Sequence, residues 1–143
     1  MSDTQTIRYY QQIPDVLSYF AAVHPLIESH GLDRTLRDLV HLRASQINGC
    51  AFCIRMHTRE ARQNGESNER LDRLVGWRHM SDYSERERAA LAWTEALTLL
   101  EREADYAAMR AALRRHFSDQ EIAALTAEVA MINLWNRMQI SCH

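Results

Sequence analysis

The sequence contains no lysine, and all 17 of its basic residues are arginines. Without a lysine amine, the chain can neither form a Schiff base with a carbonyl substrate nor build a Walker-type phosphate loop. Its 19 acidic residues outnumber the arginines and give a formal net charge of −2 at pH 7. Because nucleic acid binding depends on concentrated positive charge against phosphate, we expect no nucleic acid partner.

Long apolar runs and an export signal are also missing. No stretch approaches the roughly 18 uninterrupted apolar residues of a membrane helix, and no basic segment followed by an apolar run stands near the N-terminus. We therefore expect a cytoplasmic protein with no membrane partner. Three cysteines are too few for a disulfide scaffold, so in a reducing compartment their spacing carries more meaning than their number.

Glycine and proline are scarce, with four and two residues in a chain of 143. The apolar residues recur at helical rather than alternating spacing, which predicts an all-α fold. The length suits a single domain, so we expect one domain over residues 1–143 with six or seven helices. The predicted helices cover residues 14–31, with Pro25 expected to kink or divide the helix, and 34–46, 50–65, 71–77, 89–100, 106–117 and 122–138.

Two of these helices have clear start signals. Ser84 stands three residues before Glu87, and Ser118 stands three residues before Glu121. This spacing is typical of a capping box, in which each side chain satisfies a backbone N–H of the other residue. Both pairs precede apolar-periodic runs, so we expect helices to begin there.

The chemically informative segment is Asn48-Gly-Cys50-Ala-Phe-Cys53-Ile-Arg-Met-His57. On a helix, Cys50, Cys53 and His57 share one face because they follow each other by three and four positions. The two thiols lie one turn apart, a separation that suits a disulfide. A helix that begins at Cys50 would favour a thiolate in its first turn, with His57 as a base within reach of Cys53.

A thiolate beside a second thiol can attack an oxidant or a disulfide, and its neighbour can then resolve the product. This redox chemistry needs no cofactor and no metal. Two other interpretations stay open. The cysteines can be packing residues of a buried face, or the C-x2-C-x3-H spacing can supply three zinc ligands, although no second cysteine pair is present to close a structural site.

Residues 42–57 (LRASQINGCAFCIRMH), together with the later pairs Ala61-Arg62 and Gly65-Glu66, resemble the alkylhydroperoxidase D-like branch of the carboxymuconolactone decarboxylase superfamily. Residues 85–98 (ERERAALAWTEALT) and 133–137 (NLWNR) are similar to the same family. The resemblance extends from about residue 10 to 140. It implies an all-helical fold that assembles into trimers or hexamers and carries a thiol peroxidase site.

The resemblance also implies roles for four residues. Cys53 corresponds to the peroxidatic thiol, Cys50 to the resolving thiol and His57 to the relay base. The family usually has a glutamate twelve residues before the first cysteine, and this chain has Asp38 there. Because aspartate is one methylene shorter, we expect a proton relay that either needs a bridging water or is weaker, with the same chemistry. Phe52 replaces a histidine of the founding members, so their lipoyl-linked physiology does not transfer directly.

Two further residues have open interpretations. His41 follows Asp38 by one helical turn and is either a site residue or a solvated or interface histidine. Cys142 lies outside the motif at the end of the chain, and we interpret it as incidental.

These observations predict a thiol-dependent alkylhydroperoxidase, an antioxidant oxidoreductase that acts on a hydroperoxide and forms a disulfide. An external dithiol or thiol protein would be its reductant, and the protein would be a homo-oligomer. One alternative is a redox-responsive binding or assembly protein with little turnover, whose disulfide changes helix packing. Another is a carboxymuconolactone decarboxylase, although those members generally lack the CxxC motif.

Overall fold

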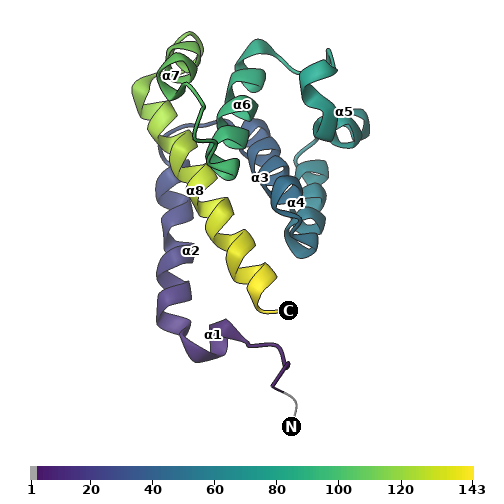
Figure 1. The fold of residues 1–143 in the computed structure, drawn as a ribbon, viewed down its shortest axis with the longest axis vertical. Coiled ribbons are helices and arrows are strands. Elements are labelled where there is room, and N and C mark those ends of the chain that lie inside the picture. The colour runs from purple at the N-terminus through teal and green to yellow at the C-terminus, as the bar shows by residue number, and fades with distance from the viewer. Residues whose placement is uncertain (1–2) are drawn as a thin grey trace.

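The computed structural model describes residues 3–143, and within them it contains helices and no β-strand (Figure 1). The elements are α1 (Tyr9–Gln12), α2 (Pro14–Glu28), α3 (Arg34–Asn48), α4 (Ala51–Gln63), α5 (Asn68–Arg73), a 3-10 helix (Leu74–His79), α6 (Glu85–Leu99), α7 (Tyr106–Arg114) and α8 (Asp119–Ser141). The predicted all-α class is confirmed. The described residues form eight α-helices rather than six or seven, because α1 was not predicted; it is a single turn that buries no residue.

Local sequence signals set most of the helix boundaries. Ser84 and Ser118 both form complete capping boxes, as predicted. Pro25 lies inside α2 and does not divide it. Gly49 ends α3 with a φ of 68°, a left-handed conformation that glycine adopts without steric cost. The chain therefore turns sharply after α3 and starts α4 directly behind Cys50.

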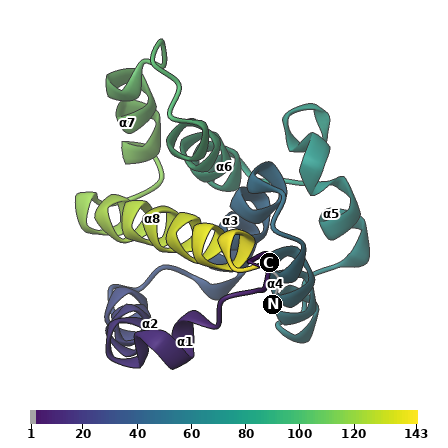
Figure 2. The same cartoon turned by 60° about the horizontal axis from the view of Figure 1, so that its bottom comes forward.

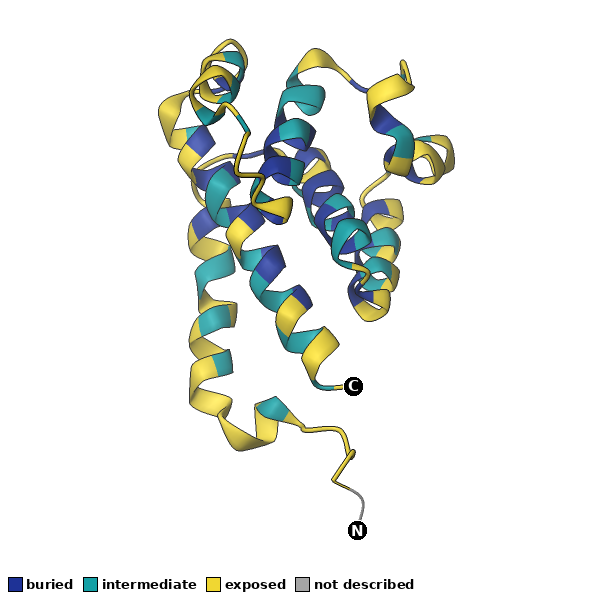
Figure 3. Ribbon diagram, viewed as in Figure 1, coloured by how far each residue is buried: buried dark blue, intermediate teal, exposed yellow. Residues whose placement is uncertain are grey.

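Helix α3 lies at the centre of the fold and packs against α4, α6 and α8. One side of α3, with Leu36 and Val40, joins a core cluster that includes residues of α6, α7 and α8. The other side, with Leu39 and Leu42, joins a second cluster that reaches α4, α5 and the 3-10 helix. Figure 3 shows the buried residues concentrated on these central helices. Together the helices form one compact domain, with α3 as its shared wall.

The N-terminal helices are less embedded than the rest. Figure 2 shows α1 and α2 on one side of α8, with α6 and α7 on the other. Helix α2 packs on α8, and Ile27 is its one buried residue. None of the helices formed by residues 3–143 is long and apolar enough to cross a membrane.

Candidate functional site

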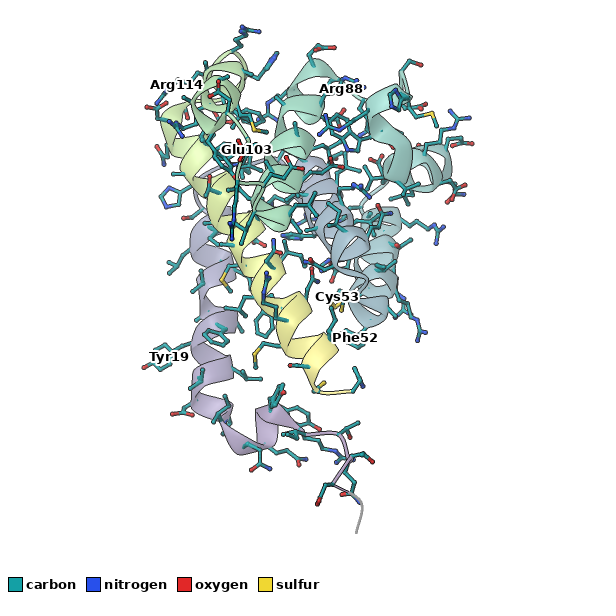
Figure 4. All side chains as sticks on the ribbon, in the orientation of Figure 1. Tyr19, Phe52, Cys53, Arg88, Glu103 and Arg114 are labelled. Atoms are coloured by element: carbon teal, nitrogen blue, oxygen red, sulfur yellow. The ribbon has the colours of Figure 1, made fainter. Side chains whose placement is uncertain are left out.

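The two cysteines of the motif lie in the first turn of α4. Cys50 is the N-cap residue, and its Sγ accepts a hydrogen bond from the backbone N–H of Cys53 at 3.4 Å. Both thiols are free and almost fully buried, at 2% and 1% exposure. Figure 4 shows Cys53 and the neighbouring Phe52 at the end of α4 that faces the C-terminal part of α8. The predicted placement of both thiols at the start of a helix is therefore correct.

The Cys53 thiol is protonated at neutral pH. Burial, with a smaller effect from a hydrogen bond to Cys50, raises its pKa to about 12, although a hydrogen bond from Asn136 acts in the opposite direction. The helix N-terminus was expected to favour a thiolate in this turn. For Cys53 the cost of burying a charge is larger, and the amide at the helix start is directed to the sulfur of Cys50 instead. Cys53 therefore needs a base before it can act as a nucleophile.

A network of half-buried and buried amides orients the hydrogen-bond donor beside Cys53. The Nδ2 of Asn48 donates to the Oδ1 of Asn136 at 2.9 Å, which fixes the orientation of the Asn136 amide. The Nδ2 of Asn136 then donates to the Oγ of Ser45 at 3.0 Å and also acts on Cys53. Asn136 is completely buried, and these hydrogen bonds link α3 and α8 behind the thiols. The network therefore holds the amide of Asn136 as a hydrogen-bond donor beside the buried sulfur of Cys53.

His57 is a buried neutral base. Its Nδ1 lies 3.1 Å from the Oε2 of Glu60, one turn further along α4. Because a carboxylate accepts hydrogen bonds, the imidazole hydrogen is on Nδ1 and the lone pair is on Nε2. This Nε2 is buried and has no hydrogen-bond partner among residues 3–143. Burial, together with the charges of His41 and His24, lowers the pKa of His57 to about 3.

The two cysteines of the motif are joined by a hydrogen bond, but His57 is not directly connected to either of them. No hydrogen bond in the described part of the chain joins His57 to Cys50 or Cys53. Proton transfer from Cys53 to the Nε2 of His57 therefore requires a bridging molecule or a change of rotamer. The structure places the three residues close together along α4, as predicted. It also leaves the Nε2 of His57 free to accept a proton.

Asp38, the carboxylate that the resemblance assigned to the proton relay, has a different neighbour. It is buried, and its Oδ2 accepts a hydrogen bond from the Nδ2 of Asn64 at 2.8 Å. The carboxylate on the ring of His57 belongs to Glu60. Glu60 was not singled out in the sequence, although its spacing of three residues from His57 on one helix could have indicated the contact.

A second histidine lies beside His57. The ring centroids of His41 and His57 are 5.0 Å apart, and the Nε2 of His41 is 2.5 Å from the Oε2 of Glu128 on α8. Glu128 is 1% exposed. Of the two interpretations of His41, the structure therefore supports a position at the site. Glu128 was missed, and its signal in the sequence is that it is the one acidic residue in the apolar run 122–138.

The two histidines and Glu60 line a cavity of about 340 Å³ between α2, α3, α4 and α8. The lining includes His24, His41, His57, Glu60, Ile132 and Trp135. A second, more apolar cavity of about 390 Å³ lies nearby and is lined by Phe52, Trp135, Cys142 and residues of the N-terminal segment. Residues 3–143 contain no cluster of three or more histidine, cysteine or carboxylate side chains arranged for a metal ion.

The chain is similar to several known proteins. The profile of the carboxymuconolactone decarboxylase family matches residues 14–96. The uncharacterized protein YdfG of Bacillus subtilis is 33% identical over 96% of this chain and 94% of its own length. A protein of unknown function from Agrobacterium tumefaciens has a crystal structure that matches with a TM-score of 0.89 and 36% identity, covering 97% of this chain and 95% of that one.

A third match is the AhpD core of a peroxidase-related protein from Ralstonia eutropha JMP134. It has a TM-score of 0.78 and 26% identity over 91% of this chain and 70% of that chain. The family profile covers more than half of the chain, and the folds agree over nearly its whole length. The chain belongs to the carboxymuconolactone decarboxylase family, as an AhpD-like member.

Proposed function

We propose that this protein is a thiol peroxidase that reduces hydroperoxides and forms a disulfide between Cys50 and Cys53. The observation that carries the proposal is a pair of buried free thiols in the first turn of α4, beside a buried imidazole whose Nε2 has no partner in the described chain. The similar Agrobacterium protein has been assigned to antioxidant defence and the similar Ralstonia protein is described as peroxidase-related, which supports the same reaction class.

The first step oxidises Cys53. The Nε2 of His57 accepts the thiol proton as a hydroperoxide enters between them, and Glu60 holds the ring in the required tautomer. The sulfur attacks the terminal oxygen, the O–O bond breaks and an alkoxide leaves, which becomes an alcohol on protonation. Cys53 is now a sulfenic acid, so sulfur has lost two electrons and the peroxide has gained them.

The second step closes the disulfide. The sulfur of Cys50 attacks the sulfur of the sulfenic acid, and water leaves with the thiol proton of Cys50. The two residues are already one turn apart, with the Sγ of Cys50 on the backbone N–H of Cys53. An external dithiol or thiol protein then returns two electrons and two protons. Asn136 stabilises negative charge on the sulfur of Cys53 during attack.

The test measures peroxide consumption with dithiothreitol as the reductant. We expect Cys53→Ser to abolish turnover, while the control Cys142→Ser keeps the wild-type rate. Cys50→Ser should accumulate a sulfenic acid that dimedone traps on Cys53, identified by mass spectrometry. Full turnover by Cys53→Ser would disprove the proposal, and a dimedone adduct on Cys50 in Cys53→Ser would reverse the roles of the two thiols.

A second candidate function is a redox-responsive binding protein with little turnover. The observation in its favour is that the Sγ of Cys50 caps α4, so disulfide formation changes the contacts of that helix end. Phe52, between the two cysteines, is half-exposed and lines the apolar cavity. Disulfide formation without catalytic turnover, together with a change of oligomeric state between reduced and oxidised protein, would favour this function over the peroxidase.

We also propose that a second copy of the chain covers α2, in keeping with a homo-oligomer of trimer or hexamer type. Large apolar side chains are exposed along the N-terminal helices, at Tyr10, Ile13, Val16 and Tyr19. Figure 4 shows Tyr19 directed away from the rest of the molecule. Sedimentation analysis should find an oligomer for the wild type and dissociation for Tyr19→Glu. A monomeric wild type at micromolar concentration would contradict this assembly.

A further inference from the structure

The two neighbouring histidines of the site have opposite environments. His57 has an open Nε2 and carries its hydrogen on the nitrogen that faces Glu60. His41 instead presents its Nε2 to the carboxylate of Glu128 at 2.5 Å. Two titratable groups of one site whose surroundings favour different protonation states are candidates for a separate base and acid.

Glu128 requires a positive partner because it is an almost fully buried carboxylate. Burial acts to raise its pKa, yet the hydrogen bond and charge of His41, with smaller effects from the charges of Arg37 and His24, outweigh burial and hold the pKa below the usual value. Glu128 is therefore ionised and accepts the hydrogen on the Nε2 of His41. Arg37 of α3 acts on Glu128 through its charge but forms its ion pair with Glu28 at 2.7 Å, so His41 is the group that bonds the Glu128 carboxylate. The hydrogen bond from the Nε2 of His41 satisfies this buried carboxylate.

We propose that His41 is the general acid of the reaction, which protonates the oxygen that leaves when the hydroperoxide O–O bond breaks. This inference rests on the proposed peroxidase function. His57 takes the proton of the Cys53 thiol, and His41 gives a proton from its ring to the alkoxide, so an alcohol leaves rather than an anion. The proton on His57 then replaces the one lost by His41, and Glu128 holds His41 ready for the next cycle.

The other ionisable side chains around the cavity are committed to different contacts. The Nε2 of His24 accepts a hydrogen bond from the indole of Trp135 at 2.7 Å. Glu28 is paired with Arg37, and Glu60 bonds the ring of His57. Among these groups, His41 combines a position beside the base with a buried carboxylate that holds its ring by a hydrogen bond.

The experiment varies the leaving group. Reduced protein reacts in a single turnover with tert-butyl hydroperoxide, which must expel an alkoxide, or with peracetic acid, which expels a stable carboxylate that needs no acid. Acid quenching and mass spectrometry follow the oxidation of Cys53. Because general acids contribute on the order of 100-fold or more, we expect His41→Gln to lose about 100-fold with the alkyl hydroperoxide and less than about threefold with the peracid.

Two variants guard against a folding defect. Glu128→Gln should show the same selective loss, because His41 no longer has a carboxylate to hold its proton. The double variant His41→Gln with Glu128→Gln removes both buried charges together, and its selectivity should equal that of His41→Gln. His116→Gln, at an exposed histidine outside the site, should match the wild type with both oxidants.

Equal losses with both oxidants would overturn the general-acid role and leave His41 with a structural role only. A wild-type rate for His41→Gln with tert-butyl hydroperoxide would also overturn it. A wild-type protein that consumes neither oxidant would disprove the peroxidase function itself, and the inference with it. The result that establishes the role is a change in the ratio of the two rates, which a general loss of packing does not produce.

Discussion

Two clusters of partly or fully buried charge lie on opposite sides of α3, and they are built differently. The first is centred on Arg70 of α5, which donates to Glu66 at 3.0 Å, to Glu87 and to the backbone oxygen of Asp82. The ring of Tyr83 lies under its guanidinium group, 5.0 Å away, and the Tyr83 hydroxyl donates to the Arg70 carbonyl. The second cluster contains His41, His57 and Glu128.

The electrostatic consequences of the two clusters also differ. In the Arg70 cluster, the ion pair raises the pKa of Arg70 and, against the effect of burial, lowers the pKa of Glu87. Each group is stabilised in its charged form. In the other cluster, burial keeps the imidazole of His57 neutral, and its Nε2 has no partner in the described chain. The Arg70 cluster, whose charged groups are paired, stabilises the fold. The buried His57, whose Nε2 has no partner, can accept a proton in a reaction.

The sharpest test of this comparison is His57→Gln. We expect a loss of about 1,000-fold in peroxide turnover, because the variant removes the base that accepts the Cys53 proton. The free energy of unfolding at neutral pH should change by less than about 1 kcal/mol, since the Nε2 of His57 makes no hydrogen bond in the described structure. Stopped-flow peroxide assays and urea unfolding measure the two quantities. A large loss of stability without loss of turnover would show that both clusters are structural.

Arg70→Met should give the opposite pattern. Removing the guanidinium group leaves the carboxylates of Glu66 and Glu87 unpaired at 10% and 14% side-chain exposure, so we expect a loss of about 3 kcal/mol in the free energy of unfolding. The folded variant should keep wild-type peroxide turnover. Arg114→Met is the matched control, because its ion pair with Asp119 is largely exposed and should contribute little. Equal effects of the two substitutions on stability would contradict the comparison.

Features of the site that depend on local spacing could be predicted from the sequence. Cys50, Cys53 and His57 lie within one segment of eight residues, and helical geometry alone placed them on one face. The capping boxes at Ser84 and Ser118 are equally local and were also predicted. The short α1 was not, because a single turn without buried residues has no apolar periodicity to detect.

Contacts between helices that are distant in the sequence could not be predicted from such local patterns. His41 and Glu128 are 87 positions apart and meet because α3 and α8 pack together. The resemblance gave Asp38 a place in the relay from its position in the sequence. The structure shows that Asn64 bonds the Asp38 carboxylate, because the end of α4 returns past α3 at that point. Spacing identifies which residues share a face but not which atoms of another helix they meet.

A third prediction concerns acid stability and separates the clusters by pH. The pKa of His57 is about 3 in the folded protein and 6.5 for an ordinary histidine. Between these two pH values, His57 is therefore protonated in the unfolded chain but not in the folded chain. Stability therefore rises with pH in this window, and the His57 contribution lost between pH 6.5 and roughly pH 5 is about 2 kcal/mol.

Urea unfolding of the reduced protein across this window measures the effect. The ionisable side chains of His24, His41, Glu60 and Glu128 lie near His57, so the relevant quantity is the difference between the wild type and His57→Gln. Between pH 6.5 and roughly pH 5, the free energy of unfolding of His57→Gln should fall by about 2 kcal/mol less than that of the wild type. Parallel curves for the two proteins would show that His57 is not held neutral by the fold.

The smallest expected effect separates the two carboxylates near His57. Asp38→Asn keeps a side chain that can bond Asn64, and Asp38 does not contact the imidazole, so turnover should fall by less than about threefold. Glu60→Gln weakens the contact that fixes the tautomer of His57, and loss of such an orienting carboxylate typically costs about tenfold or more. Peroxide turnover of both variants should be measured at one pH with one oxidant. If Asp38→Asn lowers turnover more than Glu60→Gln, the relay runs through Asp38, as the family resemblance implied. The carboxylate that assists His57 would then come from α3 rather than from α4, the helix that carries His57.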